Sequence, residues 1–81
     1  MNEFNLIHRI VLRAIALDVT HDGAFTAMLD IEAAHRQCPL RLDEFLNASD
    51  VDFVHDFCGI QQHMNRETGV LEDHFLPRFA L

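Results

Sequence analysis

The chain has 81 residues, 49% of them hydrophobic, and a formal net charge of −7 at pH 7. This length predicts one domain, residues 1–81, and excludes an enzyme built from separate cofactor and substrate domains. The hydrophobic fraction is too high for a disordered acidic tail, and no apolar run is long enough to span a membrane. With no secretory signal at the start and only two Cys, the sequence predicts a reduced, cytoplasmic setting.

The first predicted element is a helix from residue 2 to about residue 18, with Asn2 as its N-cap. Arg9 and Arg13 lie on its polar face, where two like charges are expected to point outward toward acidic partners. Apolar residues with helical spacing form a wide stripe, which predicts a central core helix. The stripe comprises Phe4, Ile7, Val11 and Ala14, with Ile10 and Ile15 beside it.

A break at residues 20–23 precedes a second helix, which Thr20 or Asp22 can cap and which runs to about residue 36. It must end near Cys38, because Pro39 pushes the residue before it out of the α region. Its predicted inward stripe contains Phe25, Met28 and Leu29, followed by Ile31 or Glu32 and then His35.

A short helix is predicted at residues 43–47, and a third main helix begins after Ser49 and ends near residues 67–68. Ser49 to Asp52 is a capping box with Asp in place of Glu, and Gly69 is a suitable C′ residue. The predicted inward stripe comprises Val51, Val54, Phe57 and Cys58, with Phe53 and Met64 at its flanks. The fold class is therefore all-α, with three main helices, one short helix and an extended C-terminal tail.

The tail, residues 70–81, shows no clean period around Pro77, although a short strand at residues 70–71 stays possible. It either closes the core as a strap or docks onto a second subunit or another partner. Phe and Arg are residue types that anchor interfaces. We therefore expect a protein-interaction segment made of Phe75, Leu76, Pro77, Arg78 and Phe79.

Two His-x-x-Cys pairs, His35 with Cys38 and His55 with Cys58, together offer four zinc ligands. They lack the usual Cys-x₂-Cys or His-x₃₋₅-His spacing, and Cys58 falls on an apolar stripe where a free Cys acts as a small hydrophobe. We therefore predict no metal and no cofactor, and keep a zinc-stabilised regulatory module as an alternative. No phosphate-binding loop, nucleophile elbow or zinc-protease string occurs, so an enzyme is not expected.

The acidic excess argues against direct binding to nucleic acid, whose affinity rests on Lys and Arg contacts to phosphate. It permits imitation of DNA, which is a second alternative. Two acids of the densest acidic block already have a role in helix capping, which weakens that alternative. The block consists of Asp43, Glu44, Asp50, Asp52 and Asp56.

The second half of the chain contains five characteristic strings: CPLRLD (38–43), DFVHD (52–56), GI (59–60), HMNRETG (63–69) and FLPRFA (75–80). With these strings it resembles a family of small, mostly uncharacterised helical proteins encoded by tailed phages and prophages. It implies a short cytoplasmic protein made in an infected bacterium and carries no catalytic residues. Small acidic phage proteins commonly bind a host protein of defence, transcription or pilus machinery. We therefore expect a non-enzymatic inhibitor or modulator of a host protein, and a homodimer, because so short a chain often gains stability from a second subunit.

Overall fold

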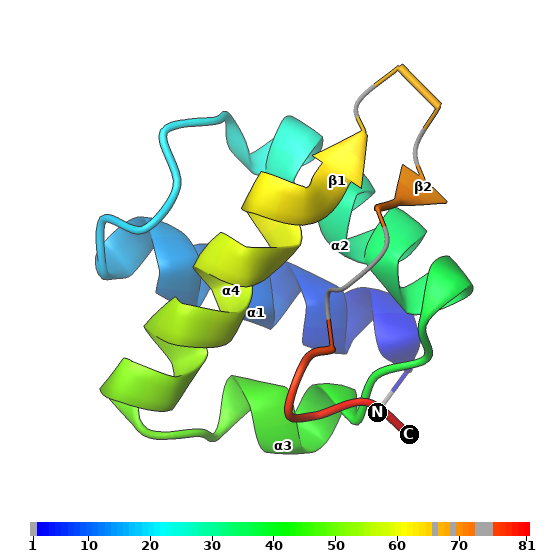
Figure 1. Ribbon diagram of the computed structural model, residues 1–81. Coiled ribbons are helices and arrows are strands. Elements are labelled where there is room, and N and C mark those ends of the chain that lie inside the picture. Colours follow the sequence, from blue (N-terminus) through cyan, green and yellow to red (C-terminus); the bar gives the residue numbers. More distant parts are fainter. Residues whose placement is uncertain (1, 66, 69, 73–75) are drawn as a thin grey trace.

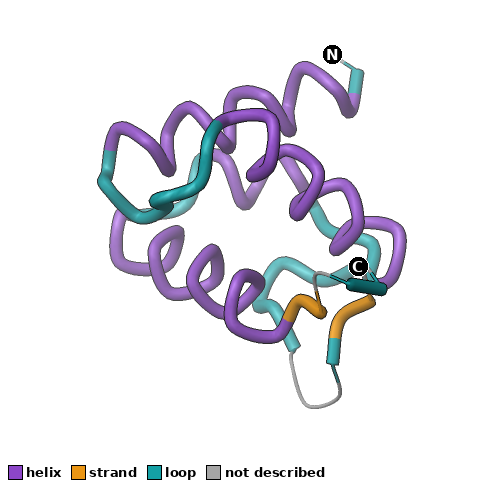
Figure 2. Tube along the Cα trace, turned by 90° about the horizontal axis from the view of Figure 1, so that it is seen from above, coloured by secondary structure: helices purple, strands orange, loops and turns teal. Residues whose placement is uncertain are grey.

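The computed structural model describes residues 2–65, 67–68, 70–72 and 76–81. These form α1 (Glu3–Ala16), α2 (Ala24–Gln37), α3 (Leu42–Leu46), α4 (Asp50–His63) and a ribbon of β1 (Met64–Asn65) and β2 (Val70–Leu71). The predicted all-α class, with three longer helices and one short one, is confirmed. Helix α1 packs on α2 and α3, and α2 also packs on α4 and β2. Figure 1 shows α4 crossing in front of α1, and Figure 2 places these two helices on opposite sides of the molecule.

Helix α1 begins and ends through local hydrogen bonds that its sequence supplies. The Asn2 side chain accepts a hydrogen bond from the Asn5 amide at 2.8 Å, as the N-cap prediction requires. At the other end Asp18 adopts φ 57°, and the Val19 amide donates to the Ala14 carbonyl at 2.9 Å. This is a Schellman motif with Asp at the left-handed position that usually holds Gly.

The predicted stripe of α1 is right at its centre and wrong at its edges. Its buried residues are Ile7, Ile10, Val11 and Ala14, whereas Phe4 and Ile15 are exposed. The helix is apolar over more of its circumference than its neighbours cover. The uncovered part forms a second apolar stripe.

The start of α2 differs from the prediction. Its N-cap is Gly23, which makes no side-chain capping bond. The Thr20 hydroxyl instead accepts hydrogen bonds from the Asp22 amide at 3.2 Å and from Gln61 Nε2 at 2.9 Å. Thr20 therefore ties the α1–α2 loop to α4 rather than starting a helix.

The predicted inward stripe of α2 is right at Ile31, which is buried, and at Met28, which packs against the core, but wrong at Phe25 and Leu29. Phe25 and Leu29 are 76% and 48% exposed. The helix buries smaller residues instead, because Ala side chains let its backbone approach α1 and α4 closely. The buried set is Ala27, Asp30, Ile31, Ala33 and Ala34.

Helix α4 shows the same rotation of the inward face. Its predicted stripe began at Val51, which is 78% exposed, whereas the buried residues are Phe53, Asp56, Phe57 and Ile60. Phe57 was correctly placed in the stripe, and Phe53, predicted only at its flank, lies at the centre of the buried face. Its cap is as predicted, since Ser49 Oγ accepts from the Asp52 amide at 3.3 Å. Burial of two Phe side chains removes more apolar surface from water than burial of two Val side chains, so α4 turns its Phe53 and Phe57 face toward the core.

Helix α4 ends at His63, earlier than predicted, because the chain turns into a two-stranded antiparallel ribbon. Met64 pairs with Leu71 and Asn65 with Val70. The Asn65 side chain closes the turn by accepting from the Glu67 and Thr68 amides. The predicted cap at Gly69 lies outside the described residues.

The core is built around four Phe rings from three parts of the chain. The centroids of the Phe45 and Phe53 rings are 5.1 Å apart in an edge-to-face arrangement, and those of the Phe53 and Phe57 rings are 5.8 Å apart. Phe79 of the C-terminal segment stacks on Phe45 at 5.5 Å. This aromatic cluster joins α3, α4 and the chain's last residues.

Arg13 joins α1 to the two helices that carry the cluster. Its guanidinium lies 4.6 Å from the centroid of the Phe53 ring, a cation–π geometry. It also donates to the Leu46 carbonyl and pairs with Asp50 at 2.8 Å. Arg13 thus has the acidic partner that was predicted, but it is partly buried against Phe53 instead of pointing outward. Among the described residues, no helix has both the length and the apolar character needed to cross a bilayer.

Candidate interaction surface on helix α4 and the C-terminal segment

The last residues of the chain run as a strap beside the link between α2 and α3. The Arg41 amide donates to the Phe79 carbonyl at 2.7 Å, and the Leu81 amide donates to the Pro39 carbonyl at 2.8 Å. Leu40 and Ala80 form an isolated antiparallel bridge. Residues 76–81 therefore dock on their own domain, which resolves the two possibilities left open for the tail in favour of a strap.

Two of the residues expected to contact a partner pack against the protein's own domain instead. Pro77 is buried, and the partly buried Phe79 ring completes the aromatic cluster described above. Phe75 lies outside the described residues. Of the predicted segment, this leaves Leu76 and Arg78 as exposed members.

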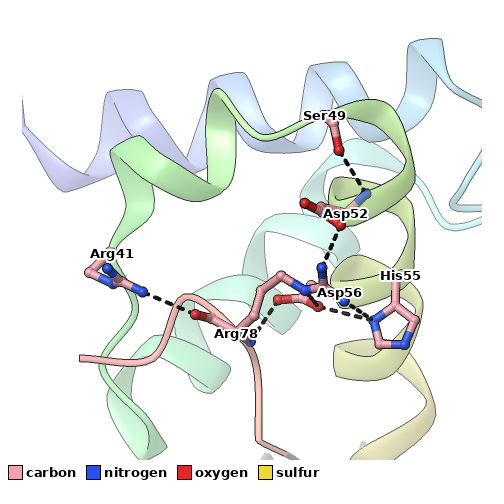
Figure 3. A network of polar contacts seen from close by, with 6 residues as sticks. All are labelled: Arg41, Ser49, Asp52, His55, Asp56 and Arg78. Carbon is pink, nitrogen blue, oxygen red and sulfur yellow. Dashed lines mark hydrogen bonds and ion pairs between the residues drawn. The ribbon is translucent and has the colours of Figure 1, made fainter.

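Arg78 fastens the strap to α4. Its backbone amide donates to Asp56 Oδ2 at 2.9 Å, and its Nε donates to Asp56 Oδ1 at 3.1 Å. A further guanidinium nitrogen, Nη1, pairs with Asp52 one helical turn earlier (Figure 3). The Asp56 carboxylate is only 3% exposed, so its charge is compensated almost entirely by this arginine. We call Arg78, Asp52 and Asp56 the Arg78 clamp.

Two more side chains frame the clamp. His55 Nδ1 lies 3.1 Å from Asp56 Oδ1 and 3.4 Å from Arg78 Nη2. From the other side, Arg41 Nη2 donates to the Arg78 carbonyl at 3.0 Å (Figure 3). The sequence shows Asp52 and Asp56 four residues apart on one helix face. It does not show that their partner lies more than 20 residues further on, and the clamp was therefore missed.

Beside the clamp lies an apolar surface along α4. Leu76, immediately before Pro77, is 86% exposed, and Val51 at the start of α4 is 78% exposed. Two shallow hollows connect them, because both hollows are lined by Val54 and His55. The hollow next to Leu76 also includes Cys58. We call Val51, Val54, His55, Cys58 and Leu76 the α4–tail surface.

The two His-x-x-Cys pairs have separate surroundings. His35 Nδ1 accepts from the Leu40 amide at 3.0 Å, and its Nε2 lies 3.3 Å from a Glu3 oxygen. Cys38 is the C-cap residue of α2, whereas His55 and Cys58 belong to the α4–tail surface. Within the described ranges, no three His, Cys, Asp or Glu side chains are grouped so that they could hold a metal ion.

The acidic block considered for DNA mimicry is largely neutralised by arginine. Its ion pairs link Arg41 to Glu44, Arg13 to Asp50, and Arg78 to both Asp52 and Asp56. Four of the five carboxylates thus have a cationic partner. The block contributes to holding the domain together as well as to its surface charge.

These features define a small, mostly all-α domain with a two-stranded ribbon and a C-terminal strap fastened to α4. The chain belongs to the family of unknown function DUF6874, which matches residues 2–81 and so covers nearly all of it. No curated protein and no solved structure matches the chain.

Proposed function

We propose that this protein is a non-enzymatic binding protein that docks on a protein of a bacterial host cell and inhibits or redirects it. The observation that carries this proposal is the α4–tail surface, where two large apolar residues, Val51 and Leu76, are mostly exposed and line two adjoining hollows. The resemblance to small phage-encoded proteins supports the phage origin, the host cytoplasm as the location, and defence, transcription or pilus machinery as the class of target. All of these belong to the proposal.

The Arg78 clamp explains how an extended segment can present a binding residue. Leu76 precedes Pro77, which is buried, and Arg78, which makes two hydrogen bonds to Asp56. The chain that follows Leu76 is therefore anchored on the domain, and less conformational entropy is lost on binding. An exposed aliphatic anchor on a preorganised backbone is a favourable arrangement for recognition.

The shape and charge of the surface favour an amphipathic helix of the target with basic residues on its flanks. The hollows lie lengthwise along α4 from Val51 to Leu76, which suits a helix laid against a groove. The chain carries a net charge of −7, and Asp50 borders the hollow at the Val51 end. A basic partner would be attracted over a distance and held in register by such charges.

The test starts with affinity capture from bacterial lysate and continues with direct binding measurements on the purified target. We expect Leu76→Asp and Val51→Asp to weaken the affinity by roughly 30-fold or more each, as loss of an anchor residue does. Leu81→Asp is the matched control, because Leu81 is also in the strap and 81% exposed but lies outside the two hollows. Equal affinity for the Leu76→Asp and Leu81→Asp variants would contradict the proposed surface.

A further inference from the structure

A second apolar surface lies on the other side of the molecule, on α1 and α2. On α1, exposed residues recur at intervals of four, four and three, and the ring of Phe4 stacks on His8 with centroids 6.5 Å apart. On α2 a corresponding stripe follows the helical period, in which Phe25, Leu29 and Arg36 are exposed and Glu32 is half-buried. The two stripes, which we call the α1–α2 face, comprise Phe4, His8, Leu12 and Ile15 of α1 and Phe25, Leu29, Glu32 and Arg36 of α2.

The stripes adjoin each other at one end. Phe4 of the first stripe and Glu32 and Arg36 of the second line the same hollow. The contact between Glu3 and His35 shows that the start of α1 lies beside the end of α2. The α1–α2 face is therefore one surface contributed by two packed helices.

We propose that the α1–α2 face binds a second copy of the chain to form a two-fold symmetric dimer. Phe4 and Phe25 are 59% and 76% exposed, and Leu12, Ile15 and Leu29 are each close to half exposed. Together they present roughly 500 Å² of apolar surface. A dimer interface buries about 800 Å² per partner, of which about 65% is apolar in homodimers. The face thus supplies the apolar area that a stable dimer needs.

The charges on this face are compatible with self-association. Two copies that each carry −7 repel each other, and a contact that brings opposite charges together offsets part of that repulsion. Glu32 and Arg36 supply one charge of each sign, and Glu3 and His35 line the same hollow. In a two-fold symmetric dimer the same surface of both chains is in contact, so Glu32 of one chain can face Arg36 of the second copy.

The test compares the association state of three chains by analytical ultracentrifugation. In the double variant Phe4→Glu/Phe25→Glu both new acids lie in the first turn of a helix, where negative charge favours the helix dipole. The fold is therefore preserved while the face gains charge. The matched control is Val51→Glu, the same kind of change in the first turn of α4.

We expect the wild-type chain and Val51→Glu to sediment as dimers, and the dimer Kd of the double variant to rise by roughly 100-fold or more. A wild-type chain that is monomeric at roughly 200 μM overturns the proposal, because a dimer that is stable in solution has a lower Kd than that. Equal dissociation of Val51→Glu overturns the assignment to this face. A monomeric wild type whose target binding is lost in the double variant assigns the face to the target instead. Since target binding is measured at Leu76 and Val51, the two proposals fail separately.

Discussion

The α4–tail surface and the α1–α2 face expose similar side chains but are supported in different ways. On the α1–α2 face, each apolar residue belongs to a helix whose backbone bonds are local and whose position is set by small buried residues such as Ala27 and Ala34. On the α4–tail surface, Leu76 belongs to a segment without secondary structure. It is held by the Arg78 clamp and the Phe79 ring. One surface depends on helix packing and the other on long-range polar contacts, so mutations can separate them.

The largest effect is expected from the aromatic cluster, which supports both surfaces. Phe45→Ala removes a fully buried ring that contacts Phe53 and Phe79, and should lower the free energy of unfolding by about 3–5 kcal/mol. Urea unfolding followed by circular dichroism measures this loss. Phe25→Ala is the matched control and should change stability by less than about 0.5 kcal/mol in the monomer. A Phe45→Ala loss as small as that of the control would contradict the described core.

The clamp should affect only one of the two surfaces. Asp56→Ala leaves the Arg78 amide and guanidinium without their buried acceptor, and we expect about 2–3 kcal/mol of destabilisation. Hydrogen exchange should rise in residues 76–81 and stay unchanged in α1. Asp52→Ala is the control on the same helix; its carboxylate is exposed, and the expected loss is at most about 1 kcal/mol. Equal losses for the two variants would show that Asp56 is not the main attachment of the strap.

The small residues of α2 provide the complementary test. Ala34→Leu inserts a larger side chain where no surface is exposed, and overpacking should cost about 1–3 kcal/mol. Ala24→Leu, at the exposed start of the same helix, should be close to neutral. Thermal unfolding compares the two. If Ala34→Leu is tolerated as well as Ala24→Leu, α2 does not owe its position to close Ala packing.

The smallest effect concerns the turn after α1. Asp18→Gly places the residue best suited to φ 57° in the Schellman motif, and should stabilise the protein by about 0.5–1 kcal/mol. Asp22→Gly, where no positive φ occurs, should give no gain. A shift in the urea midpoint measures both. A loss of stability in Asp18→Gly would indicate that the Asp side chain contributes more than the backbone strain costs.

The sequence predicted elements better than it predicted their orientation. The caps at Asn2 and Ser49 and the stop before Pro39 are local and were correct. The predicted inward faces of α2 and α4 are right at Ile31 and Phe57 but rotated from the observed ones, because apolar character alone does not show which apolar residues of a helix are buried. Which face of a helix is buried depends on how closely the neighbouring helices approach. In this fold Phe25 and Val51 stay exposed, and other residues of the same helices pack into the core.

The candidate site was predicted only in location. Leu76 and Arg78 belong to the expected interaction segment, but Asp56, the buried acceptor, appears in the sequence only as one acid of the densest acidic block. A carboxylate that will pair with an arginine of a distant segment looks, in its local sequence, like any other carboxylate on a helix. Such a pair is a product of tertiary structure, and the sequence alone shows only its two halves.

The strap also makes the closing of this core a long-range event in folding. Its bonds join Pro39 and Arg41 to residues 79–81, and the Phe79 ring stacks on Phe45 of α3. The helices form from contacts that are local in sequence, whereas the aromatic cluster is complete only when two distant parts of the chain meet, which is a slower step. A folding intermediate with formed helices and an undocked strap would expose an open core, and it would be a natural substrate for chaperones and proteases.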